Sequence, residues 1–402
     1  MANQLLHTPD GVRDIYSEEY EKKHVIEGRI DQTMRLFGYH PIQTPTFEFF
    51  DIFGSEIGTT ASSDLYKFLD RDGNTLVLRP DFTPSIARCA AKYYMDDEIP
   101  VRFCYNGSTF LNSGNYKGLD KESTQSGVEL VGDGSVDADA EMIALSVEVL
   151  KSTGLKDFQI SIGHVDFLIG LFEAAGLGAE TEDQIRELLL NRNFYGVEDC
   201  IARADLPEDL VWLFGLLKDV MLTREKLSEA RQRAKNYPKI GQALARLEQL
   251  EDLLRVYGVE QYVFYEMAMV LELHYYTGII FSGYTFGSGE AVLKGGRYDH
   301  LLEAFGKSAP SIGFAVVIEQ LMAALKHQNI EVPFANGTRW LVYDETGRET
   351  AIREAVRLRE AGEKAELMPL GGSNTRESYQ RYAEAMHIKE ILFYTKEDAC
   401  DT

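Results

Sequence analysis

The hydrophobic positions near the start of the chain repeat with the period of a helix. Ile26, Ile30, Met34 and Phe37 recur every three or four residues, which places them on one face of a helix predicted for about 15–37. Gly38 follows at once, and glycine commonly ends a helix. A second amphipathic run predicts a helix from Asp137 that ends at Gly154. This first part of the chain therefore has long helices with one apolar face.

Short apolar or alternating runs between these helices predict strands. They lie at 38–50, 76–78, 101–107, 124–132 and 158–164, and strands return at 263–269, 275–287 and 290–296. Between the two groups, residues from about 167 to 255 are rich in leucine at helical spacing and predict a helical insertion. Strand and helix signals therefore predict one domain, 1–330, with the insertion inside it.

The last part of the chain has a pattern of its own. After a Pro- and Gly-containing linker at 330–338, the order of apolar runs predicts β-α-β-α-β. Alternation of this kind is typical of a small α/β domain with a parallel sheet. We expect this second domain to span 336–402.

Composition narrows the function classes. The 402 residues carry a formal net charge of -23, which repels phosphate backbones, so we expect no nucleic-acid partner. The four cysteines are scattered and form no C-x-x-C pair, which argues against a zinc or redox motif, and the eight histidines show no metal-ligand spacing. No apolar run is long enough to span a membrane, and the start lacks the apolar core of a signal peptide. We expect a cytoplasmic protein without metal, cofactor or membrane partner.

Two possible phosphate motifs fail on inspection. Gly306-Lys307-Ser308 resembles the end of a P-loop, but Leu301 occupies the position where that motif needs a glycine. The acidic cluster Asp96-Asp97-Glu98 lacks the small, Gly-rich turn of a phosphoribosyl-pyrophosphate loop and precedes Pro100. The sequence therefore predicts no phosphate-transfer site.

Several segments, in order, resemble a known family. LHTPDGVRDIY to FEFFDIF resembles the opening and motif 1 of class II aminoacyl-tRNA synthetases, and RFCYNGSTF with STQSGVELVG resembles motif 2. LRPDFTPSIAR, LELHYYTGIIF and VLKGGRYDHL resemble segments of histidyl-tRNA synthetases, and SIGFAVVIEQL resembles motif 3. The likeness covers about 330 residues. It implies an α+β fold with a class II antiparallel sheet core and a helical insertion, followed by a shortened anticodon-binding-like α/β domain.

The resemblance implies a histidine pocket. The positions that match the family's pocket are Asp81, Thr83, Gln125, Glu129, Tyr275 and Tyr276. Asp81 replaces the family's usual glutamate. Gln125 and Glu129 share one face of a predicted strand because side chains alternate, so Val128 and Leu130 face the opposite, core side. Carboxylates suit an α-ammonium and an imidazole N–H, because charge-assisted hydrogen bonds are strong.

The resemblance also implies lost chemistry. Leu111, Leu271 and Gln320 stand where the family has arginines that hold ATP. Without these cations, most of the electrostatic stabilisation for phosphoryl chemistry is missing. We therefore expect no catalytic residues and no enzyme activity.

A family with these properties exists, the regulatory subunits of short-form ATP phosphoribosyltransferase. The resemblance implies a chain that activates a separate catalytic ATP phosphoribosyltransferase subunit and senses L-histidine as feedback inhibitor, as a homodimer within a hetero-oligomer. A divergent active histidyl-tRNA synthetase and an amino-acid sensor for an unrelated partner are the alternatives. Read singly, each pocket residue has a structural explanation, and Arg297 and Asp299 are equally compatible with a structural ion pair and with ligand contact.

Overall fold

The structure, a computed structural model, describes residues 6–54, 60–96, 99–112, 120–269, 275–334, 337–371, 374–386 and 388–396. The chain forms two compact units, Met1–Val332 and Pro333–Thr402. Leu271, one of the positions singled out for a lost arginine, lies outside the described residues.

The centre of the larger unit is an eight-stranded sheet in the spatial order β1-β5-β6-β11-β10-β9-β7-β8. The inner pairs are antiparallel, as predicted, whereas the edge strands β1 and β8 pair in parallel with β5 and β7. The strand bounds are β1 His40–Pro41, β5 Val101–Phe110, β6 Glu122–Val131, β7 Phe158–His164, β8 Val263–Tyr265, β9 Ile279–Thr285, β10 Leu293–Arg297 and β11 Ser311–Val317.

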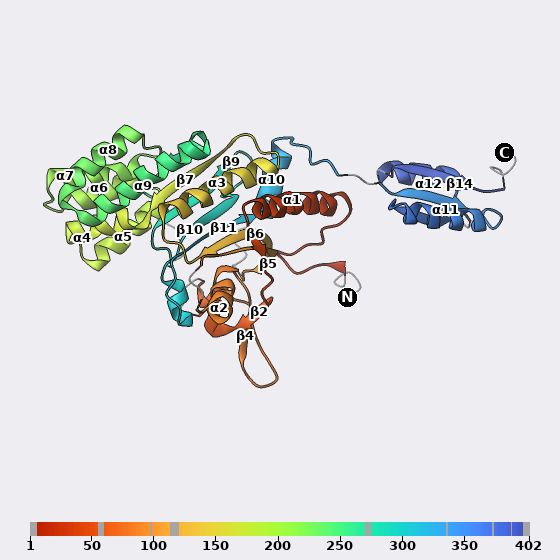
Figure 1. Ribbon diagram of the computed structural model, residues 1–402, viewed down its shortest axis with the longest axis horizontal. Coiled ribbons are helices and arrows are strands. Elements are labelled where there is room, and N and C mark those ends of the chain that lie inside the picture. Colours follow the sequence, from red (N-terminus) through yellow and green to blue (C-terminus); the bar gives the residue numbers. More distant parts are fainter. Residues whose placement is uncertain are drawn as a thin grey trace. The chain divides into compact units, whose positions relative to one another are not determined.

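Three helices cover one face of this sheet, α1 (Ser17–Leu36), α3 (Val136–Ser152) and α10 (Ile318–His327), as Figure 1 shows. Ile26 and Ile30 of α1 lie in the same fully buried cluster as Val128 and Leu130 of β6. Burial of such aliphatic side chains contributes about 1.5–3 kcal/mol each. The predicted first helix and the predicted core side of β6 are both confirmed.

The opposite face of the sheet carries smaller elements. These are helix α2 (Thr83–Tyr93), the 3-10 helix η7 (Leu301–Phe305), and a small antiparallel sheet in the order β2-β4-β3. The bounds of its strands are β2 Phe47–Phe49, β3 Lys67–Leu69 and β4 Thr75–Leu78.

The prediction of a single strand over 38–50 is wrong. Its first part forms β1 in the large sheet and its last part forms β2 in the small sheet. Pro41 and Pro45 lie in this segment, and proline donates no ladder hydrogen bond, so pairing cannot continue through it.

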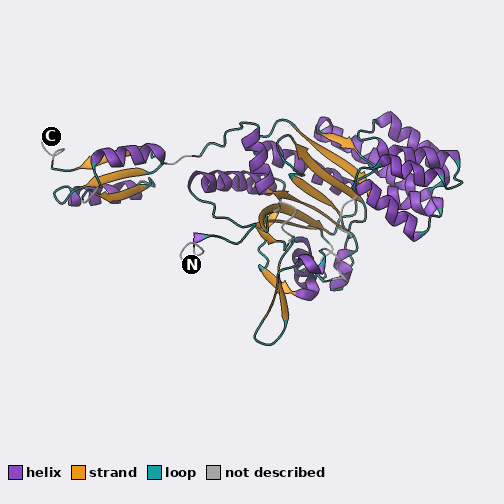
Figure 2. Cartoon of the chain, turned by 180° about the vertical axis from the view of Figure 1, so that it is seen from behind, coloured by secondary structure: helices purple, strands orange, loops and turns teal. Residues whose placement is uncertain are grey.

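The helical insertion follows β7 and returns before β8. Figure 2 shows its helices grouped at one end of the large sheet. Their bounds are α4 Val165–Ala175, α5 Ala179–Leu190, α6 Phe194–Ala202, α7 Glu208–Gly215, α8 Arg224–Arg233 and α9 Pro238–Tyr257. Arg246 of α9 donates to the fully buried Asp139 of α3 at 2.7 Å, which ties the insertion to the sheet domain.

The smaller unit has the predicted β-α-β-α-β order. A parallel sheet in the order β13-β12-β14 is built from β12 (Arg339–Tyr343), β13 (Ala365–Pro369) and β14 (Glu390–Tyr394), with helices α11 (Arg348–Glu360) and α12 (Arg376–Ala385) between them. In the part of the chain that the structure describes, no helix is both long and apolar enough to span a bilayer.

Candidate ligand-binding site

The face of the large sheet opposite α1, α3 and α10 has a floor of glycines. A Cβ atom at Gly127 would lie 2.5 Å from the Tyr105 hydroxyl, and one at Gly313 would overlap the Glu129 carboxylate. Because glycine has no side chain, functional groups of neighbouring residues lie directly on the backbone of the sheet at these positions. The pairs of glycine and overlying side chain are Gly107 with Arg79, Gly127 with Tyr105, Gly296 with Tyr276 and Gly313 with Glu129.

Glu129 is the most buried ionisable group of this floor. Only 1% of it is exposed, and it accepts hydrogen bonds from the Thr83 hydroxyl at 2.7 Å and from the Tyr298 hydroxyl. Burial raises its pKa to about 8, although the two hydroxyl donors act in the other direction, and the nearby Asp81 carboxylate adds to the rise. Without a cation beside it, this carboxyl is therefore protonated at neutral pH.

Asp81 lies just before helix α2 and faces the same site. It accepts from the Thr83 backbone N–H at 3.2 Å and from the Tyr275 hydroxyl at 3.4 Å. Burial raises its pKa above the ordinary value. Asp81 thus satisfies a helix N-terminal donor, as a purely structural interpretation expects, and also contacts a second pocket residue.

The paired tyrosines form a wall of the site. The ring centroids of Tyr275 and Tyr276 lie 4.7 Å apart, and Tyr298 meets Tyr275 edge-on at 5.9 Å. The Tyr276 ring lies over Gly296, the neighbour of Gly313 in the adjacent strand. Because Glu129 lies over Gly313, an aromatic surface and a carboxyl stand side by side on the floor.

Gln125 lies four residues before Glu129 on strand β6, so the two side chains point to the same face of the sheet. The register pairs Gln125 with Gly107 and Val317, and Glu129 with Phe103 and Gly313. The Gln125 side-chain oxygen is buried and has no hydrogen-bond partner among the described residues. Such unsatisfied acceptors are rare because each one costs free energy, so this oxygen is suited to accept from a ligand.

The structure therefore brings together all six predicted pocket residues around one face of the sheet. It also adds Tyr298 and Tyr105, which the sequence reasoning missed. Tyr298 directly follows strand β10, where alternation puts Gly296 and Tyr298 on the site face and Arg297 on the other. The GGRYD motif carried this signal, but only the sheet order shows that Tyr298 reaches Glu129.

Arg297 is a structural residue. Its guanidinium is 4% exposed and donates to Asp139 at 2.9 Å and to Asp299 at 3.2 Å. It therefore lies on the helix-covered side of the sheet, where both Arg297 and Arg246 donate hydrogen bonds to the Asp139 carboxylate. The ligand-contact interpretation of this arginine is not supported.

Arg79 is likewise held in place by the protein. It donates to the carbonyl oxygens of Ser108 at 2.8 Å and Thr44 at 3.0 Å, and its guanidinium lies 4.0 Å from the centre of the Phe82 ring. Two described positions of lost arginines, Leu111 and Gln320, carry no charge. In the described ranges no group of three or more His, Cys, Asp or Glu side chains is placed to hold a metal ion.

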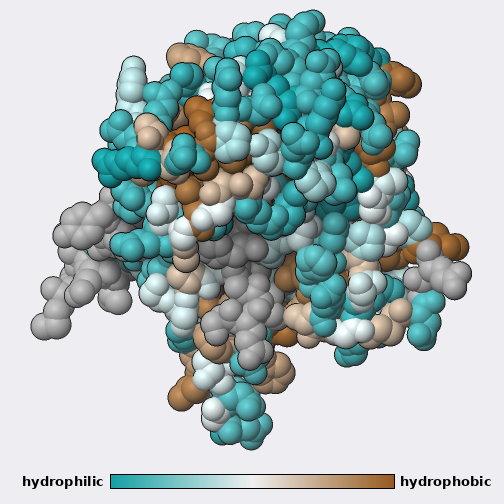
Figure 3. Space-filling model, turned by 90° about the vertical axis from the view of Figure 1, so that its left-hand side faces the viewer, coloured by the Kyte–Doolittle hydropathy of each residue, from teal (hydrophilic) through white to brown (hydrophobic). Residues whose placement is uncertain are grey.

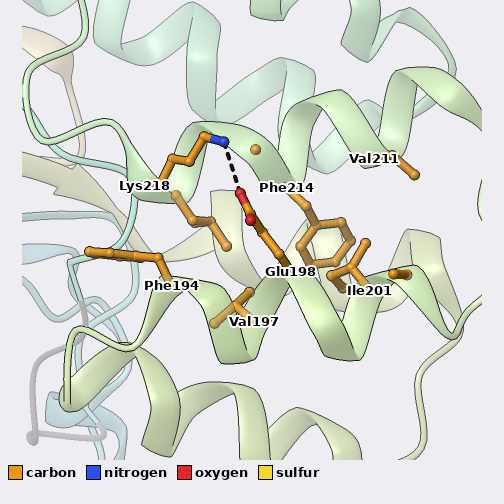
Figure 4. Close-up of a pocket in the computed structure, with 10 residues that line it drawn as sticks. Phe194, Val197, Glu198, Ile201, Val211, Phe214 and Lys218 are labelled. Carbon is orange, nitrogen blue, oxygen red and sulfur yellow. Dashed lines mark hydrogen bonds and ion pairs between the residues drawn. The ribbon is translucent and has the colours of Figure 1, made fainter.

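A separate pocket of about 260 Å³ lies in the helical insertion and shares no residue with this site. Figure 4 shows Phe194, Val197, Ile201 and Phe214 around it, with the Glu198–Lys218 ion pair of 2.8 Å nearby. This pocket lacks the converging carboxylates and the unpaired acceptor of the sheet site.

Figure 3, which views the molecule from the left-hand side of Figure 1, shows a largely hydrophilic surface with scattered hydrophobic residues.

Comparison with known proteins places the chain in a family. Residues 11–321 match the sequence profile of histidyl-tRNA synthetase. A curated relative from Acetivibrio thermocellus, named ATP phosphoribosyltransferase regulatory subunit, is 37% identical over 98% of this chain and 93% of its own length. A relative of the same name from Ruminiclostridium cellulolyticum is 36% identical over 99% of this chain and 94% of its own length. The chain belongs to the family of ATP phosphoribosyltransferase regulatory subunits.

Solved structures agree with this family. One from Bacillus halodurans, described as an ATP phosphoribosyltransferase regulatory subunit/histidyl-tRNA synthetase, is 32% identical with a TM-score of 0.85, covering 97% of this chain and 98% of its own. A histidyl-tRNA synthetase from Nostoc sp. PCC 7120, 18% identical over 98% of this chain and 93% of its own, shares the fold with a TM-score of 0.79. The predicted class II synthetase-like α+β fold and the predicted regulatory, non-catalytic role in histidine biosynthesis are confirmed.

Proposed function

We propose that the glycine-floored site binds free L-histidine and that the chain reports its concentration to a catalytic ATP phosphoribosyltransferase subunit. The observation that carries this proposal is a pair of buried polar groups on the floor, Glu129 and Gln125. Glu129 is a buried carboxyl with a raised pKa, and Gln125 is a buried acceptor without a partner. Both are suited to the two nitrogen-bearing ends of histidine.

The imidazole is assigned to the Glu129 end of the site. The Tyr276 ring beside Glu129 offers a flat surface on which an imidazole packs. A cationic imidazole ionises Glu129, because an opposite charge at contact distance lowers the pKa of a carboxyl. The α-ammonium is assigned to the Gln125 oxygen and to Asp81, which adds a negative charge at the start of α2.

The site recognises an amino acid without the cations that would activate it. A bound but unreacted ligand changes function only if two states of the protein bind it with different affinity. By linkage, histidine that disfavours the active complex must bind the active complex more weakly by the same factor, usually by about 1–3 kcal/mol. The output then lies on the separate catalytic subunit, in a cytoplasmic complex that contains a homodimer of this chain.

The smaller unit has a place in this proposal. We assign residues 336–402 as a shortened anticodon-binding-like domain that follows a synthetase-like domain, 1–330. A net charge of -23 does not favour RNA binding, so this domain is assigned to protein contacts or to an inherited remnant.

A reconstitution tests the proposal. The catalytic subunit is combined with wild-type chain or with Glu129→Ala, and histidine is titrated against phosphoribosyl-ATP formation. Loss of a partner for a buried charged group costs about 1–3 kcal/mol, so half-maximal inhibition moves to histidine concentrations about 5- to 150-fold higher. Glu122→Ala, an exposed glutamate of the same strand, is the matched control. Identical inhibition with Glu129→Ala would place the sensor on the catalytic subunit.

A further inference from the structure

The ligand carboxylate has no partner among the residues assigned so far. A free amino acid carries a carboxylate, and a site that recognises one normally offers it a cation or several N–H donors. Asp81 and Glu129 are acidic, Gln125 is assigned through its oxygen, and Nε and Nη1 of Arg79 already donate to backbone carbonyls. A lysine on the same face of the sheet, Lys294, offers a further cation.

One cross-strand row of the floor is open at Ala315, between Tyr105, which lies over Gly127, and strand β10. The register aligns Lys294 of β10 with Ala315 of β11, and Ala315 with Gly127 of β6. Ala315 is partly exposed, whereas its neighbours Phe314 and Val316, which point to the helix-covered side, are buried. A small side chain in the middle of a sheet leaves space above it, beside the Tyr105 side chain that lies over Gly127.

Lys294 borders this open row. Alternation along β10 places it on the same face as Gly296, which lies beneath Tyr276, and opposite the fully buried Leu293. Its side chain is 52% exposed, and its ion pair with Glu290 is long, at 3.9 Å. An exposed pair of this length contributes little, so the ammonium is free to contact another anion.

The reach of this lysine matches the site. Neighbouring strands lie about 4.8 Å apart, so the Cα atoms of Lys294 and Gly127 are separated by about 10 Å across the open row. The flexible four-carbon stem of lysine carries its charge over Ala315 into that row. An amino acid held at its ammonium by Gln125 has its carboxylate on the same side.

We propose that Lys294 binds the α-carboxylate of the amino-acid ligand. This assignment rests on the proposed histidine site. It adds a residue that recognises the carboxylate, which histidine has and an imidazole-containing amine lacks. It gives the pocket one cation in a position different from the arginines that the synthetase motifs supply. The occupied pocket then has Glu129 at the imidazole, Gln125 at the ammonium and Lys294 at the carboxylate.

Titration calorimetry with two ligands tests the assignment. L-Histidine carries the carboxylate, whereas L-histidinol keeps the imidazole and the ammonium and replaces the carboxylate with an alcohol. Both are titrated into wild-type chain, Lys294→Met and Lys294→Arg. Lys151→Met, which removes an exposed lysine from α3 on the other side of the sheet, controls for the change in net charge.

The expected result is selective. A hydrogen bond to a charged group is worth about 1.5–3 kcal/mol, so Lys294→Met weakens histidine binding about 10- to 150-fold. Histidinol affinity changes by less than about twofold, Lys294→Arg retains most of the preference for histidine, and Lys151→Met resembles wild type. If Lys294→Met weakens both ligands equally, or neither, the assignment is wrong while the histidine site stands. If the wild-type chain binds no histidine, the proposed function fails together with the assignment.

Discussion

Replacing Glu129 by glutamine tests the electrostatics of the ligand-free protein. Burial raises the pKa of this carboxyl from an ordinary value of 4.5 to about 8. The folded protein therefore holds a proton that the unfolded chain releases above about pH 4.5. This contribution to stability is complete below that pH and is lost as the pH rises through about 8. Glutamine keeps the shape of the protonated acid and does not titrate.

The size of this pH-dependent change in unfolding free energy follows from the difference between the folded and unfolded pKa values of Glu129. Each pH unit over which the folded group binds one extra proton changes the unfolding free energy by about 1.36 kcal/mol. Between pH 6 and pH 9, the wild-type chain therefore loses about 2–3 kcal/mol through Glu129, and Glu129→Gln loses none through this position. Below about pH 4.5, where Glu129 is neutral in both the folded and the unfolded chain, the two proteins have similar stability, because the amide reproduces the neutral acid beside Thr83 and Tyr298.

Urea unfolding of ligand-free protein at pH 6, 7, 8 and 9 measures this difference. Glu122→Gln, at the exposed start of the same strand, controls for the loss of one negative charge. We expect the stability of Glu129→Gln relative to wild type to increase by about 2–3 kcal/mol from pH 6 to pH 9, with most of the increase below about pH 8. Parallel pH profiles for wild type and Glu129→Gln would refute a carboxyl that is neutral at pH 7.

Three further outcomes are expected. Gly313→Ala places a Cβ against the Glu129 carboxylate and should lower histidine affinity in calorimetry by about 1–3 kcal/mol, with unchanged affinity contradicting the packing described. Asp139→Ala leaves buried Arg297 with Asp299 as its remaining carboxylate partner and should lower the unfolding free energy by about 3–5 kcal/mol, clearly more than Arg246→Ala, whose side chain is partly exposed. Histidine-dependent ATP–pyrophosphate exchange should stay at the level of a no-protein control, and exchange above it would restore a synthetase activity.

The sequence predicted what depends on local periodicity. Alternation along β6 correctly placed Val128 and Leu130 in the core, and with them put Gln125 and Glu129 on the other face. It could not show that Tyr298 meets Glu129, because that contact crosses from β10 over β11 to β6. The strand order that joins these residues is a property of the whole fold.

Burial set a second limit on the sequence reasoning. Arg297 was equally compatible with ligand and structural roles until its partner, Asp139, was found more than 150 positions earlier in the chain. The segment 38–50 was wrongly predicted as one strand, because apolar spacing does not show which sheet a strand joins. Pairing partners distant in sequence decide both cases.

For the proposed site, the glycine floor limits which parts of the protein could respond to a bound ligand. The floor is backbone, held by hydrogen bonds across the central strands of an eight-stranded sheet, and those bonds cannot rearrange one at a time. The side chains resting on the floor, and the segments that carry them, such as the start of α2 and the Tyr275–Tyr276 turn, lie outside these central strands. We therefore expect ligand binding to be coupled to the catalytic subunit through the side chains and segments that lie on this face, while the sheet itself keeps its structure.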